Sequence, residues 1–314
     1  MANTFLTPTV IAQQALATLY ESTVMAQLVH RDYSAEFARK IGDTITVRKP
    51  AVFVANEFVR TTGIVVQDAT ETGFPVVLNH FADVSFAVTS EDMALRIEDF
   101  EGQLLGPAME AISQKIDRDL MLLRNDITQV VGTAPENAAG QDYNGYAGNY
   151  PWSDSRVLIQ AGKVLSQRKV PTTERRVAMG PETAARYKAE KVWRQSDFRG
   201  STEGLLEANL GPRVAGFDPY ETQNIQVPAP QGVGISTTEV DIAFHKTAFA
   251  LVTRPLELPK GAVNAAVMSY KGFGLRVIYG YDQAKKQDVV SIDCLYGTKT
   301  LDANRAVLIK GVNG

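Results

Sequence analysis

Pairs of neighbouring carboxylates come closest, in type and spacing, to residues that could do chemistry in this chain. The pairs are Glu91-Asp92, Glu98-Asp99 and Asp117-Asp119. Two carboxylates whose pKa values differ form a common acid–base device. Each pair, however, falls at a predicted helix start or on a charged helix face, where capping and solvation are the ordinary roles. We therefore expect no acid–base catalysis from them.

Nucleophilic and metal-binding side chains are few. The chain has one cysteine, Cys294, and three histidines, which are His30, His80 and His245. A lone cysteine forms no intramolecular disulfide, and one thiol with three scattered imidazoles makes a zinc site hard to assemble. Cys294, His80 and His245 fall in predicted strands, so ordinary sheet positions account for them. No Gly-x-Ser-x-Gly elbow offers a serine nucleophile.

Glycine-rich phosphate-binding motifs are also missing from the sequence. Gly272-Phe273-Gly274, followed by Gly280, departs from the spacing of the dinucleotide fingerprint, and no Walker-type loop occurs. We therefore expect a protein that is not an enzyme and that holds no cofactor or metal. The alternative that this reasoning leaves open is an enzyme with unfamiliar site residues.

The composition is that of a folded protein with a small net charge. Of its 314 residues, 45% are hydrophobic and 21% charged, which is enough for one or two cores. The net charge of -3 gives no cationic surface for nucleic acid, so any DNA contact needs a local face. No apolar stretch is long enough for a membrane span, and the first residues do not follow the order of a secretory signal. We expect a soluble protein made in the cytoplasm, with no membrane contact.

The N-terminal part of the chain changes its period at Gly42-Asp43. Apolar residues at helical spacing before that point predict an amphipathic arm, residues 1–41. Alternating β-branched residues then predict a strand from Thr44 that continues past Pro50 to Val59. A polar segment, Arg60 to Gly73, leads into a second alternating run, Val76 to Val88. We predict one long β-hairpin that needs a neighbour to lie on.

The clearest periodic signal is an apolar stripe that predicts a helix from about Glu98 to Ile127. At 1.5 Å per residue this helix would be about 45 Å long. Its stripe includes Ile112, Ile116 and Leu120, which we expect to be buried against a sheet as the structural spine. Gly106-Pro107 interrupts it, so the helix either bends there or starts at the proline.

The rest of the chain mixes short helices and strands. A helix is predicted from Ser153 to Gln167, and another after Gly180-Pro181. Residues 216–314 consist mostly of short β-rich runs, and the polar stretch Arg194 to Gly211 has little pattern. The fold class expected is α+β.

This order of elements resembles the Hong Kong 97 capsid fold of tailed double-stranded DNA phages. The sequence is also similar to the coat-protein branch of short-tailed enterobacterial phages. The segments that carry this resemblance are Gly42–Pro50, Thr89–Phe100, Pro107–Met109, Ile116–Asp117, Ala215–Asn224 and Ala248–Pro259. It implies an N-terminal arm (1–41), an extended hairpin loop (42–89) and a spine helix of the peripheral domain (90–130). A mainly axial domain (131–235) and strands shared by both domains (236–314) would follow.

The resemblance implies a major capsid protein whose copies form the hexamers and pentamers of a head shell around the genome. The β-barrel domain that some members insert after Asp218 looks absent, because only about two dozen residues separate it from the strand at Asp241. The implied partners are a separate scaffolding protein, a portal and a decoration protein, with packaged DNA contacted non-specifically. The implied location is the virion, assembled in the host cytoplasm and expanding from a rounded precursor to an angular mature form.

Contacts between subunits are expected from charged residues outside the core. The candidates are Arg60, Asp68, Glu71, Arg194 and Arg199. No local motif supports covalent cross-linking between subunits. The nearest alternative is an encapsulin-like nanocompartment shell, which has the same fold.

Overall fold

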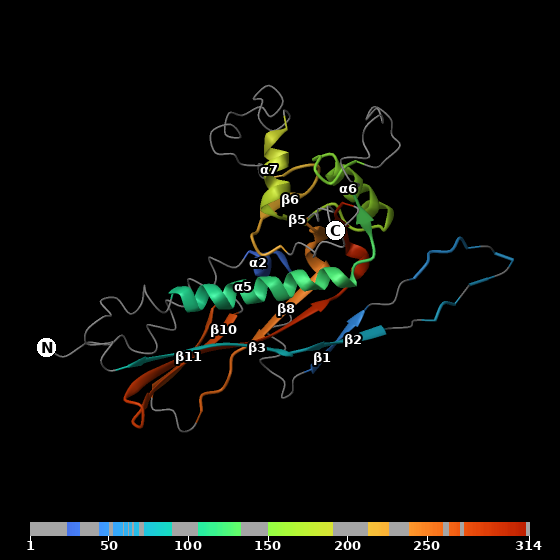
Figure 1. Cartoon of the computed structure of the whole chain (residues 1–314). Coiled ribbons are helices and arrows are strands. Elements are labelled where there is room, and N and C mark those ends of the chain that lie inside the picture. Colours follow the sequence, from blue (N-terminus) through green and yellow to red (C-terminus); the bar gives the residue numbers. More distant parts are fainter. Residues whose placement is uncertain are drawn as a thin grey trace.

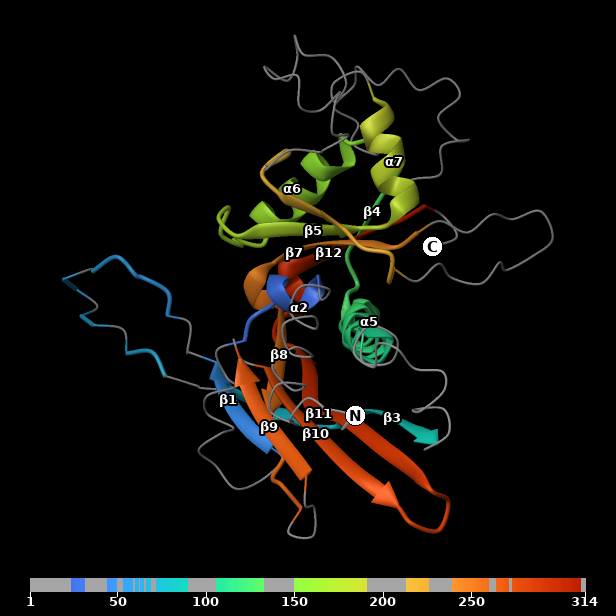
Figure 2. The same cartoon turned by 90° about the vertical axis from the view of Figure 1, so that its left-hand side faces the viewer.

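The structure is a computed structural model that describes about three fifths of the chain. It describes residues 24–31, 44–49, 53–58, 60–61, 63–64, 66–68, 72–89, 106–132, 150–190, 213–225, 239–259, 264–270 and 273–311. Its α-helices are α2 (Met25–Leu28), α5 (Gly106–Leu122), α6 (Val157–Gln167) and α7 (Pro181–Ala189). Two five-stranded sheets lie above and below α2 and α5 (Figures 1 and 2).

The larger sheet is organised around one long strand. It consists of β3 (His80–Thr89), β8 (Phe249–Arg254), β9 (Asn264–Tyr270), β10 (Phe273–Asp282) and β11 (Gln287–Thr300). β11 pairs antiparallel with β3, with β10 and, at its far end, with β8, while β9 lies beyond β10. The short β-rich runs predicted within residues 216–314 are therefore confirmed where they form β8, β9, β10 and β11.

The smaller sheet mixes parallel and antiparallel pairs. In order, its strands are β4 (Val130–Val131), β12 (Ala306–Ile309), β7 (Asp241–His245), β5 (Arg175–Met179) and β6 (Asp218–Glu221). Helices α6 and α7 lie on its side away from α5 (Figure 2). The predicted helix after Gly180 is confirmed as α7, with Pro181 in its first turn. α6 begins at Val157, later than the predicted Ser153, because residues 152–156 form turns and a bend.

Two hydrophobic clusters form the main cores. The larger one joins α2 and α5 to the large sheet, and the smaller one lies between α6, α7 and the small sheet. Alternate residues of β11 point into the larger core, as period-two side-chain geometry requires. Ile112, Ile116 and Leu120 of α5 are at most 1% exposed and belong to this core.

The predicted hairpin is only partly right. β1 (Thr44–Lys49) pairs antiparallel with β2 (Thr72–Val77), which is a short hairpin of six residues per strand. The prediction of one continuous second strand is wrong, because the chain leaves the pairing after Val77. From His80 it runs as β3 alongside β11 instead of β1. Residues 53–58, predicted as strand, form none.

Several predictions fall outside the described residues. These are the arm before residue 24, the start of the long helix before Gly106 and the polar stretch Arg194 to Gly211. The described helix ends at Leu122 and continues as a 3-10 turn, Leu123–Asp126, which stops short of the predicted Ile127. The proposed domain boundaries stay predictions. No helix in the described ranges is long and apolar enough to cross a membrane.

Candidate functional site

The segment between β1 and β2 projects away from both sheets (Figure 1). We call residues 53–68 the extension. It exposes large apolar side chains that touch no core, with exposed fractions between 62% and 86%. They are Phe53, Val54, Phe58, Ile64 and Val66. Clustered exposed apolar residues of this size mark an interaction surface more often than chance placement does.

A side-chain amide ties the two arms of the extension together. The Gln67 Nε2 group donates to the Val54 carbonyl, and the Val54 N–H donates to Gln67 Oε1 at 2.9 Å. The amide thus offers the opposite arm the donor and acceptor that a backbone peptide would offer in a strand pair. This link joins the two arms at Val54 and Gln67, neither of which belongs to a strand.

The predicted contact residues are only partly placed by the structure. Arg60 and Asp68 are both exposed and lie on the extension. Neither forms an ion pair with another described residue. Glu71, Arg194 and Arg199 lie outside the described residues, so their role stays a prediction. Sequence reasoning emphasised the charges of this segment and missed its exposed apolar side chains.

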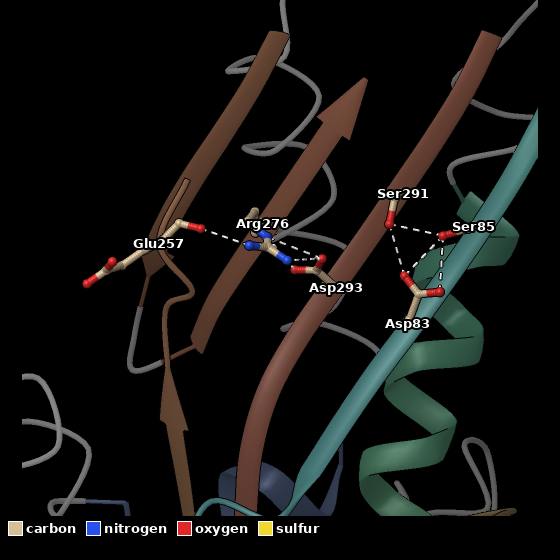
Figure 3. A network of polar contacts seen from close by, with 6 residues as sticks. All are labelled: Asp83, Ser85, Glu257, Arg276, Ser291 and Asp293. Atoms are coloured by element: carbon tan, nitrogen blue, oxygen red, sulfur yellow. Dashed lines mark hydrogen bonds and ion pairs between the residues drawn. The ribbon is translucent and has the colours of Figure 1, made fainter. Parts of the chain in front are cut away.

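A polar network occupies the face of the large sheet that points away from α5 (Figure 3). The Arg276 guanidinium donates to both oxygens of Asp293, with Nη2 to Oδ2 at 2.7 Å and Nε to Oδ1 at 3.0 Å. Arg276 Nη1 donates to the Glu257 carbonyl at 2.8 Å. This two-pronged geometry is the stronger kind of ion pair. The hydrogen bond from Arg276 to the Glu257 carbonyl holds residues 255–259, which follow β8 and which we call the strap, against β10.

The second half of this network is acidic. The Asp83 carboxylate accepts hydrogen bonds from the hydroxyl groups of Ser85 at 3.0 Å and Ser291 at 2.9 Å. Asp83 and Asp293 are direct partners in the β3–β11 register, and Asp293 is also the partner of Arg276 on β10. A row of two carboxylates and one guanidinium therefore crosses three strands. The sequence contained no signal for it, because the three residues are far apart in the chain.

The pairs considered for acid–base chemistry do not converge. Asp117 is buried against α2, whereas Asp119 accepts from Lys115 Nζ at 3.2 Å and from the Tyr296 hydroxyl. Burial raises the pKa of the Cys294 thiol to about 12, so it is a poor nucleophile at neutral pH. Within the described ranges, no group of three or more His, Cys, Asp or Glu side chains is placed to hold a metal ion. Glu91-Asp92 and Glu98-Asp99 lie outside those ranges.

A pocket of about 420 Å³ opens beside Arg276 and the strap after β8. It is lined by Leu78, Arg254, Pro255, Leu256, Glu257, Arg276 and Leu295. Its guanidinium from Arg276 is already engaged by Asp293 and the Glu257 carbonyl. The Arg276 guanidinium is therefore not available to bind a ligand in this pocket.

Comparison with known proteins gives matches in structure alone. No family model and no curated protein sequence matches this chain. A structure of Mycobacterium phage Che8 is 19% identical, with a TM-score of 0.68 over 93% of this chain and 91% of that chain. The capsid structure of cyanophage P-SCSP1u is 11% identical, with a TM-score of 0.64 over 93% and 89%.

The mature capsid of bacteriophage PhiM1 also matches. It is 11% identical, with a TM-score of 0.58 over 87% of this chain and 83% of that chain. These matches cover 87% to 93% of this chain, so they concern the whole architecture and not one motif. This chain therefore has the Hong Kong 97 type of capsid fold.

Proposed function

We propose that this chain is the major capsid protein of a tailed double-stranded DNA bacteriophage. Its copies would assemble into the closed head shell that encloses the genome, and the protein would act as a structural subunit without enzyme activity. The observation that carries the proposal is the fold shared with the capsid structure of cyanophage P-SCSP1u over 93% of the chain. Fold alone does not define function, so features of this chain must also fit a shell subunit.

The extension is the feature that fits best. Its five apolar side chains contribute nothing to the cores of the chain that carries them. Their exposure costs free energy in water, and contact with another protein surface would recover it. A second copy of the chain is the partner that a shell supplies at high local concentration. We infer that the extension lies on a neighbouring subunit within hexamers and pentamers.

Charges on the extension would add specificity to this contact. Arg60 and Asp68 are exposed and opposite in sign, so each can pair with the opposite charge on a neighbouring copy. Rim charges of this kind contribute more to register and association rate than to affinity. We keep Glu71, Arg194 and Arg199 as further candidates from the sequence alone.

The finer assignment concerns the branch and its partners. Sequence resemblance supports the coat-protein branch of short-tailed enterobacterial phages, without the inserted β-barrel domain. A separate scaffolding protein, a portal and a decoration protein would be the partners, and packaged DNA would be contacted non-specifically. The protein would be assembled in the host cytoplasm and end in the virion. We also propose Gly106 and Pro107 as a bend in the spine helix during shell expansion.

The direct test is to express the chain alone and together with its neighbouring genes, and to examine the purified product by negative-stain electron microscopy. Closed shells of uniform size are expected, at least in the co-expressed sample. A chain that remains monomeric in both samples at high concentration would contradict the proposal. Shells that enclose one host-encoded enzyme and no scaffolding protein would favour a nanocompartment instead.

A further inference from the structure

The segment 24–31 runs between the two sheets and bonds to both. Figure 2 shows α2 beside α5, with the small sheet above and the large sheet below. On the side of the large sheet, the His30 N–H donates to the Phe249 carbonyl at 3.0 Å, and the Leu251 N–H donates to the His30 carbonyl at 3.0 Å. The segment therefore pairs with β8 as a short parallel strand would.

The small sheet holds the same segment from the other side. Arg176 of β5 donates from Nη1 to the Leu28 carbonyl and, at 3.5 Å, to the Gln27 carbonyl. Met25, Ala26 and Leu28 are buried in the larger core. The segment consequently acts as a connection between the sheets, and loosening it would loosen their relative placement.

Asp117 of α5 bonds to the start of this segment. Its side chain is fully buried, and its Oδ2 accepts the Val24 N–H at 3.2 Å and the Asn224 side-chain amide at 3.5 Å. Its other oxygen, Oδ1, is buried and has no hydrogen-bond partner among the described residues. One carboxyl group thus joins α5, the start of α2 and the segment after β6. In the ionised carboxylate, Oδ1 would therefore carry negative charge without a hydrogen-bond donor to stabilise it.

The environment of Asp117 favours its neutral form. Burial raises its pKa to about 6, and the backbone N–H groups of Val24, Met25 and Ala26 and the Asn224 amide only partly offset this effect. Among the residues that the structure describes, no charged or titratable side chain of the surrounding elements forms a hydrogen bond or ion pair with Asp117. Those side chains are His30 and Arg31 of the segment, Arg176 of β5, Asp218 and Glu221 of β6, His80 of β3, and Lys115, Arg118 and Asp119 of α5.

We propose that Asp117 is a proton-controlled latch that fastens segment 24–31 between the two sheets and loosens it when the carboxyl group loses its proton. The direction follows from linkage. An Asp whose pKa is raised in the closed state binds its proton more tightly there than after opening, when the group is hydrated. The advantage of the closed state is therefore complete below the ordinary Asp pKa of 3.8 and is lost as the pH rises through about 6. The device belongs to the single chain and does not depend on the proposed shell.

Hydrogen exchange of the full-length chain tests the proposal. Protection of the peptides that cover residues 24–31 is measured at pH 5.0 and pH 7.5 and corrected for the intrinsic exchange rate. A pKa near 6 in the closed state and an ordinary value after opening predict about tenfold more opening at the higher pH. Asp117→Asn should abolish this difference, because the amide is neutral at both pH values. Asp126→Asn, an exposed position just after the same helix, should keep it.

A second variant, Asn224→Ala, tests the proposal independently if Asp117→Asn does not fold. Asn224→Ala removes a donor that lowers the pKa of Asp117, so the midpoint of the opening curve should move to higher pH. A purely structural role for Asn224 would loosen the segment without moving that midpoint. The proposal fails if the wild-type chain opens equally at both pH values, if Asp117→Asn retains the tenfold difference, or if Asn224→Ala leaves the midpoint in place.

Discussion

Asp83 on β3 and Asp293 on β11 stand directly opposite each other, so two carboxylates share one row of the large sheet. Like charges in this position ordinarily weaken a strand pair. The row is tolerated because Arg276 on β10 forms an ion pair with Asp293, while the hydroxyl groups of Ser85 and Ser291 donate hydrogen bonds to Asp83 (Figure 3). Stability at this face should therefore depend strongly on a single guanidinium.

Arg276→Gln should lower the free energy of unfolding by about 3 kcal/mol, because Asp293 is only 3% exposed and would become a buried charge without a partner. Urea unfolding of the unassembled chain measures the loss. The control is Arg276→Gln combined with Asp293→Asn, which removes the stranded charge and should recover most of the stability. Equal losses in the single and double variants would show that the guanidinium acts through packing instead.

Ile116→Asp should prevent folding or cost several kcal/mol, because it places an unpaired charge in the larger core. Leu122→Asp is the matched control, since Leu122 lies on the same helix and is 41% exposed. That variant should fold with a change within about 0.5 kcal/mol. Soluble expression and circular dichroism separate the two outcomes. A soluble, assembling Ile116→Asp protein would show that this helix face is not the spine.

Shortening the extension should separate folding from assembly. Replacing residues 57–66 by a Gly-Ser link should leave the unfolding transition nearly unchanged, because none of the exposed apolar side chains of this segment belongs to a core. The yield of closed shells should fall sharply, as measured by sedimentation and electron microscopy. Tyr281→Ser removes an aromatic side chain of β10 that is 50% exposed and serves as a surface control. Normal shells from the shortened chain would refute the role of the extension.

Asp241→Asn should change how stability depends on pH. Burial raises the pKa of Asp241 to about 7, although the Gly180 N–H donates to it at 2.9 Å. A carboxyl group with a raised pKa stabilises the fold below its ordinary value and loses that contribution as the pH rises to 7. The wild-type chain should lose up to about 4 kcal/mol relative to Asp241→Asn between pH 4 and pH 7.5. Parallel melting curves for the two proteins across this range would contradict the assignment.

Pro107→Ala tests whether the start of α5 is a working bend. The described helix begins at Gly106, and proline costs little in a first turn. If the proline sets a bend used in expansion, the variant should alter helix curvature between precursor and mature particles, as compared by cryo-electron microscopy. Normal expansion with one curvature in both states would make Pro107 a tolerated helix start.

Features that depend on neighbouring residues in the chain could be predicted from the sequence. The stripe through Ile112 and Ile116 predicted the buried face of α5, and the alternation in Val84, Phe86 and Val88 predicted which side of β3 faces the core. Pro181 after Gly180 predicted the start of α7. In each case, helix or strand geometry alone converts residue spacing into a buried side.

Strand partners and buried charges were decided only by the tertiary structure. The sequence predicted one continuous strand from Val76 to Val88, yet the chain changes sheet within it because β3 gains β11 as its partner. Asp117 and Asp119 look alike in sequence, but only Asp117 is buried against α2. Register and burial depend on contacts between residues far apart in the chain, and no local spacing records them.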